Sequence, residues 1–97
     1  MEISKSNIVV SKAGRDKDKL FFVTETDGDY ALIADGKGRR LGQPKRKKLK
    51  HLQFVAQSDS RVAEKIRTGD KVLDSEIRRA LAAFAEEFDG QIPRGGN

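Results

Sequence analysis

The apolar residues of this chain come in short runs that turn-forming residues interrupt, and this pattern is what most restricts the fold. The runs predict strands at residues 8–10, 20–24, 30–34, 37–41 and 51–55. Most of them are rich in the β-branched and aromatic residues that favour strands. Asp27-Gly28 is a strong hairpin signal between the second and third strands, because both central turn positions tolerate a positive φ. Five short strands about 10 residues apart predict a small β-barrel or sandwich.

The pattern becomes helical after residue 57. The apolar positions of a first helix are Val62, Ala63 and Ile66. Gly69 follows them, where a helix C′ glycine is typical. A second helix is predicted to begin near Asp74 or Ser75, because either side chain is a suitable N-cap. The sequence therefore predicts a mainly β fold, with a barrel in residues 1–57 and a two-helix C-terminal extension in residues 58–97.

The second helix carries an apolar stripe. It consists of Ile77, Leu81, Phe84, Ala85 and Phe88. We expect this stripe to fold back on the barrel, and the alternative is that it docks a partner protein. Phe21 and Phe22 are adjacent in a predicted strand, so one of them must face outward. That outward side chain is where we expect the helix to pack.

Positive charge is concentrated in residues 37–51, KGRRLGQPKRKKLKH, which hold eight Lys and Arg residues and no carboxylate. The net charge is −2 for residues 1–35, +8 for residues 36–58 and −1 for residues 59–97. The plain interpretation is a solvated, flexible loop. However, unneutralised cations repel one another, and a field this concentrated favours a polyanionic partner such as a phosphate backbone.

The composition also disfavours several classes of function. With 97 residues, 36% of them apolar and no Trp, the core is too small for a deep pocket, and no nucleophile–base pair is present. We therefore predict neither an enzyme nor a cofactor. The chain has no Cys, and His51 is its sole histidine, so we predict no metal site. No apolar run is long enough to span a membrane and no export signal is evident, so we expect a cytoplasmic protein.

Four segments together resemble the small bacterial KOW-domain RNA-binding proteins, which are related to a KOW-type large-subunit ribosomal protein of archaea and eukaryotes. These segments are residues 7–17, 33–36, 44–52 and 75–81. Residues 7–17 resemble the opening of the KOW motif, a β-branched strand that runs into a glycine-containing basic loop. Asn7 and Asp18 stand where that motif often has glycine. The resemblance implies a five-stranded SH3-like barrel and a role with ribosomal or other structured RNA.

We predict that the RNA contacts come from the basic segment and from the loop after the first strand. The candidate residues are Gly14, Arg15, Lys17, Lys37, Arg39, Arg40, Lys45, Arg46, Lys47, Lys48, Lys50 and His51. Gly14 would let the backbone approach a phosphate, and Asp16 is expected to orient Arg15 or to close the turn. We expect the arginines to fix the geometry of the phosphate contacts most strongly, because a guanidinium offers a phosphate two donors. Tyr30 and His51 are the candidates for base stacking.

Other interpretations stay open on the sequence alone. The chain is also consistent with an SH3-like module that docks a ribosomal or transcription protein. Residues 44–48, PKRKK, fit the pattern of a nuclear-import peptide. A basic cluster also suits an anionic membrane surface, but no amphipathic basic helix accompanies it here. Phosphate contacts do not distinguish RNA from duplex DNA.

Overall fold

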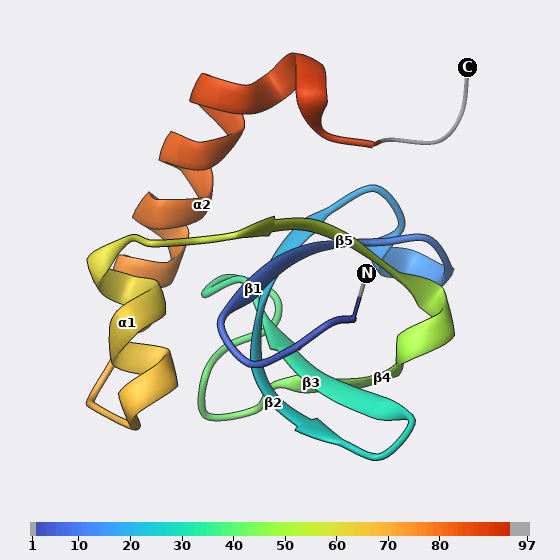
Figure 1. The fold of residues 1–97 in the computed structure, drawn as a ribbon, viewed down its shortest axis with the longest axis horizontal. Coiled ribbons are helices and arrows are strands. Elements are labelled where there is room, and N and C mark those ends of the chain that lie inside the picture. Colours follow the sequence, from blue (N-terminus) through green and yellow to red (C-terminus); the bar gives the residue numbers. More distant parts are fainter. Residues whose placement is uncertain (1, 94–97) are drawn as a thin grey trace.

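A computed structural model describes residues 2–93 of the chain. Its strands are β1 (Asn7–Ser11), β2 (Leu20–Asp27), β3 (Tyr30–Ala34), β4 (Lys45–Lys48) and β5 (Leu52–Gln57). Its helices are α1 (Arg61–Thr68) and α2 (Asp74–Phe88), with short 3-10 turns at Gly14–Asp16, Leu49–His51 and Asp89–Gln91. The predicted mainly β fold, five strands followed by two helices, is confirmed (Figure 1).

The five strands form one antiparallel sheet in the order β4-β3-β2-β1-β5. The sheet curves strongly (Figure 1), but its two edge strands, β4 and β5, are not hydrogen-bonded to each other. The Leu49–His51 turn causes this opening, because it carries the chain from one edge to the other, where β5 pairs with β1. The structure is therefore an open, curved sheet rather than a closed barrel.

Four of the five predicted strands coincide with β1, β2, β3 and β5, and the Asp27-Gly28 hairpin joins β2 to β3 as expected. The predicted fourth strand, residues 37–41, is wrong. The Asp35 Oδ1 accepts hydrogen bonds from the backbone amides of Lys37 and Arg39, both at 2.9 Å, and this turns the chain into a loop. The strand that pairs with β3 is β4, inside the basic segment.

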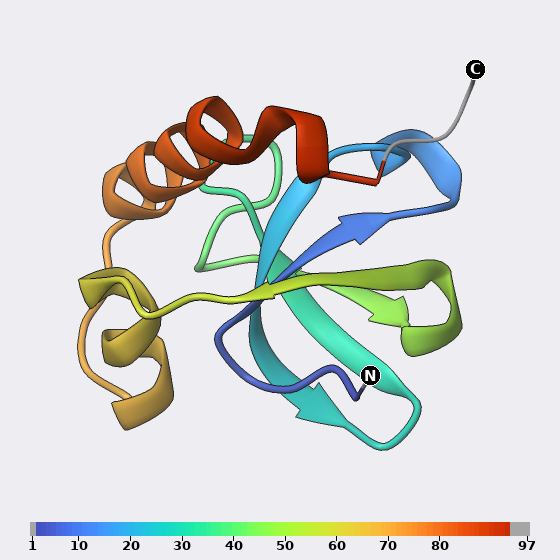
Figure 2. The same cartoon turned by 45° about the horizontal axis from the view of Figure 1, so that its top comes forward.

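The sheet has an apolar cluster on each face. Inside its curve lie Val9, Phe21, Val23, Ala31, Ile33 and Leu52. On the outer face, Ile8 and Phe22 pack with buried side chains of α1 and α2, including Ile77 and Leu81. Phe21 and Phe22 thus point to opposite faces, and the helices cover Phe22, as predicted from strand alternation. The apolar stripe of α2 is folded back on the sheet (Figure 2).

The helix ends follow local capping rules, with one correction. Ser60 caps α1 by accepting a hydrogen bond from the Ala63 amide at 3.2 Å, and Gly69 ends the helix with a φ of 78°. At α2, neither Asp74 nor Ser75 is the N-cap. Leu73 holds that position, and its amide donates to the Glu76 carboxylate at 2.9 Å. The carboxylate of Asp74 instead accepts a hydrogen bond from the Leu41 amide at 2.8 Å, which ties α2 to the loop before β4.

Candidate nucleic-acid interface

The loop after β1 holds three of the predicted residues in a compact turn. Gly14 has a φ of 76°, the left-handed region that favours glycine. Arg15 and Lys17 are exposed on either side of Asp16, which is buried. The expectation that Asp16 orients Arg15 is wrong, because its Oδ2 accepts from Arg39 Nε at 3.2 Å and from Arg39 Nη2 at 3.0 Å.

Arg39 is therefore a structural cation that joins this turn to the loop before β4. Arg40, its neighbour, is exposed and donates from Nε to the Lys37 carbonyl at 3.3 Å. Lys37 is exposed as well. Of the three predicted contacts in this loop, Lys37 and Arg40 are accessible, whereas the charge of Arg39 is neutralised by Asp16.

The four cations of β4 alternate between the two faces of the sheet. Arg46 and Lys48 are exposed, Lys45 is half-buried, and Lys47 is buried at 8% exposure. Lys47 pairs with Ala31 of the inner cluster and points inward, where its Nζ donates to the Ala13 carbonyl at 2.6 Å. The same Nζ would lie 3.3 Å from a Cβ added at Gly14. Lys47 thus anchors the loop of Arg15 and Lys17 to β4 and does not face an external ligand.

The aromatic ring of Tyr30 is already covered by a cation. The Arg46 guanidinium carbon lies 3.6 Å from the ring centroid, within the range of a cation–π contact. Arg46 also approaches the Asp27 carboxylate at 3.9 Å, between side chains that are both largely exposed, so this ion pair is weak. In this arrangement Tyr30 orients Arg46 instead of offering that ring face to a base.

The Leu49–His51 turn brings the last predicted residues to the same end of the molecule. Lys50 is exposed and His51 is half-buried. The Lys12 amide donates to the His51 carbonyl at 2.8 Å, so this turn lies beside the chain that leads into the Gly14–Asp16 turn. Figures 1 and 2 both show the two turns at the end of the sheet opposite α1.

Five of the predicted cations form what we call the basic surface. They are exposed, and they come from the two turns and from the outer side of β4: Arg15, Lys17, Arg46, Lys48 and Lys50. Of the ion pairs described for residues 2–93, one involves a member of this surface, the long Arg46–Asp27 contact. The basic surface can therefore offer most of its charge to an external anion.

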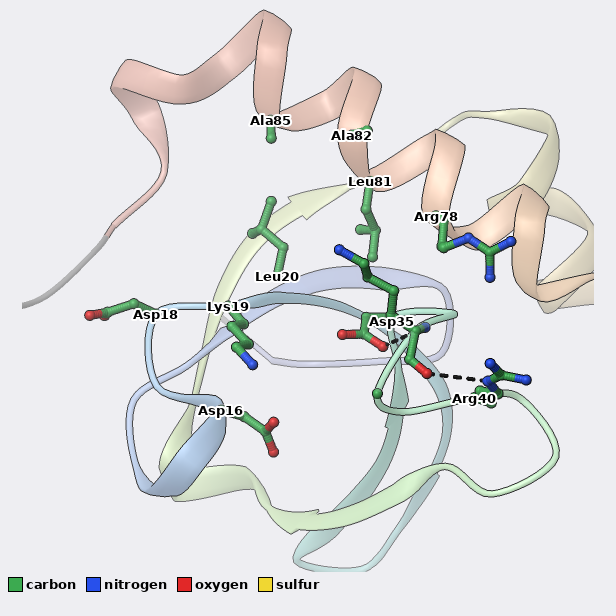
Figure 3. Close-up of a pocket in the computed structure, with 12 residues that line it drawn as sticks. Asp16, Asp18, Lys19, Leu20, Asp35, Arg40, Arg78, Leu81, Ala82 and Ala85 are labelled. Atoms are coloured by element: carbon green, nitrogen blue, oxygen red, sulfur yellow. Dashed lines mark hydrogen bonds between the residues drawn. The ribbon is translucent and has the colours of Figure 1, made fainter.

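A second group of cations surrounds a cleft between α2 and the loops beneath it (Figure 3). The cleft has a volume of about 1100 Å³, and α2 contributes Arg78, Leu81, Ala82 and Ala85 to it. Lys37 and Arg40 line it from the loop before β4, Leu20 from the first position of β2, and Lys19 from the residue before that strand. Lys19 and Arg78 were not among the predicted contacts, because nothing local in the sequence places them beside Lys37 and Arg40.

Comparisons with models of known protein families and with curated proteins find no match to this chain. Among residues 2–93, no three His, Asp or Glu side chains gather in a way that suits a metal ion. In the same part of the chain, no helix has both the length and the apolar character needed to cross a membrane. The exposed Lys and Arg side chains of the basic surface are suited to bind anions.

Proposed function

We propose that this protein binds structured RNA through its basic surface, as a non-enzymatic, cytoplasmic KOW-type protein associated with the ribosome. The observation that carries this proposal is that two segments far apart in the sequence supply five exposed cations and are tied together in the fold. The Lys47 Nζ donates to the Ala13 carbonyl and the Lys12 amide donates to the His51 carbonyl, so residues 15–17 lie beside residues 46–50. Segments that are far apart in the sequence supply the charge, so it is held on a folded surface. The phosphate backbone of a nucleic acid is a partner that matches such a surface.

The loop geometry supports the KOW resemblance. Asp18 has a φ of 70°, in the left-handed region that favours glycine, at a position where KOW loops often carry glycine. The Asp18 amide donates to the Ser11 carbonyl at 2.8 Å and closes the loop over the end of β1. This closure holds Arg15 and Lys17 at the outer side of the turn.

The distribution of donors suits recognition of the RNA backbone. Arg15 and Arg46 can each offer a phosphate two parallel N–H donors, whereas Lys17, Lys48 and Lys50 act as point charges. The sole tyrosine is in contact with Arg46, so the surface lacks the row of free aromatic rings by which single-strand readers stack bases. We therefore expect affinity to depend on RNA shape and charge more than on base sequence.

The salt dependence of RNA binding tests the proposal. If the five cations neutralise about five phosphates, the slope of log K against log salt should be roughly −3.5 to −4.5. A triple change of Arg15, Lys17 and Lys48 to Ala should make this slope shallower by about 2 to 3, because it removes three of those contacts. Fluorescence anisotropy with a labelled ribosomal RNA hairpin measures both quantities.

A charge-matched control separates this surface from net charge alone. Arg61, Lys71 and Arg79 are exposed on or beside the helices, so changing these three to Ala removes the same charge elsewhere. The control should keep the wild-type slope. Equal effects of the two triple variants, or a wild-type slope near zero, would contradict the proposal.

Ribosome association needs a separate measurement. The protein in a cell lysate should sediment with large ribosomal subunits at low salt and leave them at high salt. A position at the top of the gradient in both conditions would argue against the ribosome as the partner.

The alternative that α2 docks a partner protein receives no support from the structure, because Ile77 and Leu81 of its apolar stripe are buried against the sheet. Nuclease treatment distinguishes RNA binding from protein docking, since an RNA-mediated association is lost when the RNA is digested.

A further inference from the structure

The cleft beneath α2 combines two kinds of surface that a basic patch does not need. Ala82 is exposed and Ala85 and Leu20 are half-buried, so a solvated apolar wall faces the cleft. Below this wall, Figure 3 shows Lys19 with its side chain directed away from α2, and Arg40 beneath Arg78 at the other end of the cleft. A site with one apolar wall and one cationic rim suits a ligand that has a flat apolar part and an anionic part.

The cations at the rim are exposed and are not engaged by the described carboxylates. Lys19, Lys37, Arg40 and Arg78 are all exposed, and none takes part in the ion pairs described for residues 2–93. Arg40 and Arg78 each donate one hydrogen bond to a neutral backbone carbonyl, of Lys37 and Gly36 respectively. Each guanidinium has five N–H donors, so these bonds position the side chain without exhausting it.

Two of the carboxylates that line the cleft are engaged within the protein. Asp16 binds Arg39, and Asp35 accepts from the amides of Lys37 and Arg39. The negative charge of both carboxylates is therefore partly compensated by donors within the protein. The balance at the cleft therefore favours an anion, although acidic residues line part of it.

We propose that this cleft holds one unpaired nucleotide of the RNA bound by the basic surface. The base lies against Leu20, Ala82 and Ala85, and its phosphate is held by Arg40 and Arg78. This inference rests on the proposed RNA binding and adds a specificity element to it. Continuity supports it, because the Arg39–Asp16 ion pair joins the rim loop to the turn that carries Arg15 and Lys17. The turn that carries Arg15 and Lys17 therefore adjoins the cleft, which Asp16 of that turn also lines.

An RNA hairpin with a single bulged adenosine, compared with the same hairpin without the bulge, tests the inference. The wild-type protein should bind the bulged hairpin about fivefold more tightly, somewhat less than the factor of about ten that stacking a base on an aromatic ring contributes, because the wall of the cleft is aliphatic. Ala82→Glu places a long acidic side chain in the cleft and should abolish this preference. Ala82→Leu fills the cleft without adding charge and should also reduce it.

The matched control is Ala83→Glu, one residue along the same helix. Ala83 is exposed and does not line the cleft, so this variant has the same composition and net charge as Ala82→Glu. It should keep the preference for the bulge. If the wild type binds both hairpins equally, or if the two Glu variants behave alike, the cleft inference is overturned while the basic surface stands. Failure to bind either hairpin would instead overturn the RNA-binding proposal itself.

Discussion

Lys47 is a cation whose role is set by the face on which it lies. It stands among Lys45, Arg46 and Lys48, yet it is the one whose side chain enters the molecule and reaches the Ala13 carbonyl. A buried ammonium needs a hydrogen-bond acceptor, because desolvating it without one is costly. The bond to Ala13 meets this need and at the same time fixes the loop that carries Arg15.

We expect Lys47→Ala to lower the free energy of unfolding by about 1–3 kcal/mol, because it removes a charged hydrogen bond and leaves the Ala13 carbonyl without its donor. Lys48→Ala is the matched control, since Lys48 is exposed on the other face of the same strand. It should change the stability by less than about 0.5 kcal/mol but should weaken RNA binding. Urea unfolding followed by circular dichroism measures the difference, and equal stability of the two variants would contradict this role for Lys47.

Sequence reasoning placed these cations in a binding surface but did not separate structural from exposed ones. In an ordinary strand the inward positions are apolar and the outward ones polar, so alternation is visible. Residues 45–48 are all cationic, and this removes the signal. The structural role of Arg39 could not be predicted either, because its partner Asp16 is 23 positions earlier in the chain. Such roles depend on tertiary contacts that no local pattern encodes.

The loop between β3 and β4 is shaped by α2, an element that follows it in the chain. Gly36 has a φ of 76°, and a Cβ added there would collide with the Asp74 carbonyl oxygen and press on Arg78. Leu41, at the other end of the loop, donates its amide to Asp74. The helix therefore helps to set where Lys37 and Arg40 lie.

We expect Gly36→Ala to lower the free energy of unfolding by about 2–3 kcal/mol, because it adds backbone strain and forces α2 away from the loop. Gly38→Ala, two residues along the same loop, is the control. A Cβ at Gly38 meets no atom within 4 Å, and its φ is outside the strained region. Differential scanning calorimetry should show a lower Tm for the first variant alone. A similar Tm for both would mean that the loop and helix separate easily.

Lys65 of α1 and Glu76 of α2 link the two helices, and their contact makes stability depend on pH. The Lys65 Nζ donates to the Glu76 carboxylate at 2.9 Å, and this bond, with the Leu73 amide, lowers the pKa of Glu76 from its ordinary value of 4.5. A carboxylate with a lowered folded-state pKa stabilises the fold above its unfolded pKa. That contribution disappears as the pH falls through the folded-state pKa.

We therefore expect Glu76→Gln to be less stable than the wild type at pH 7, with the difference shrinking below about pH 4.5. Glu87→Gln removes the same charge from an exposed position on α2 and is the matched control. Its urea midpoint should follow the wild-type dependence on pH. A Glu76→Gln curve that runs parallel to the wild-type curve between pH 3 and 7 would contradict this role.

Among the strands, turns and helices, the sequence predicted correctly those that depend on a few neighbouring residues. The β2–β3 hairpin and the end of α1 at Gly69 were predicted from a few adjacent residues. The fourth strand was misplaced because Asp35-Gly36 indicates a tight turn, whereas the loop that follows is held by α2. The cleft beneath α2 was missed for the same reason, since it exists only once the helix has packed on the sheet.

The molecule is built as a curved sheet with apolar side chains on both faces. The inner cluster is enclosed by the curve of the sheet, but Ile8 and Phe22 on the outer face are covered by α1 and α2. Removing the helices would expose these side chains together. The two helices are thus part of the folding unit, and α2 also contacts the loop that carries Lys37 and Arg40.

We expect a chain of residues 1–57 to lose cooperative unfolding, because the outer apolar cluster would face water and so small a core provides little stability. Thermal unfolding and the dispersion of amide NMR signals measure this. The matched comparison is the chain of residues 1–93, which keeps all described elements. A cooperative transition with the same Tm for both chains would show that the sheet folds alone.

The position of β4 at the edge of the sheet has a consequence for how copies of the protein meet. An edge strand can recruit a strand from another molecule, and natural proteins commonly block this with charged side chains. Residues 45–48 form such an edge and read KRKK, so two copies that approach through β4 repel each other. Resistance to edge-to-edge aggregation and the proposed affinity for RNA therefore depend on the same few cations. A variant neutralised to abolish binding also loses its protection against self-association.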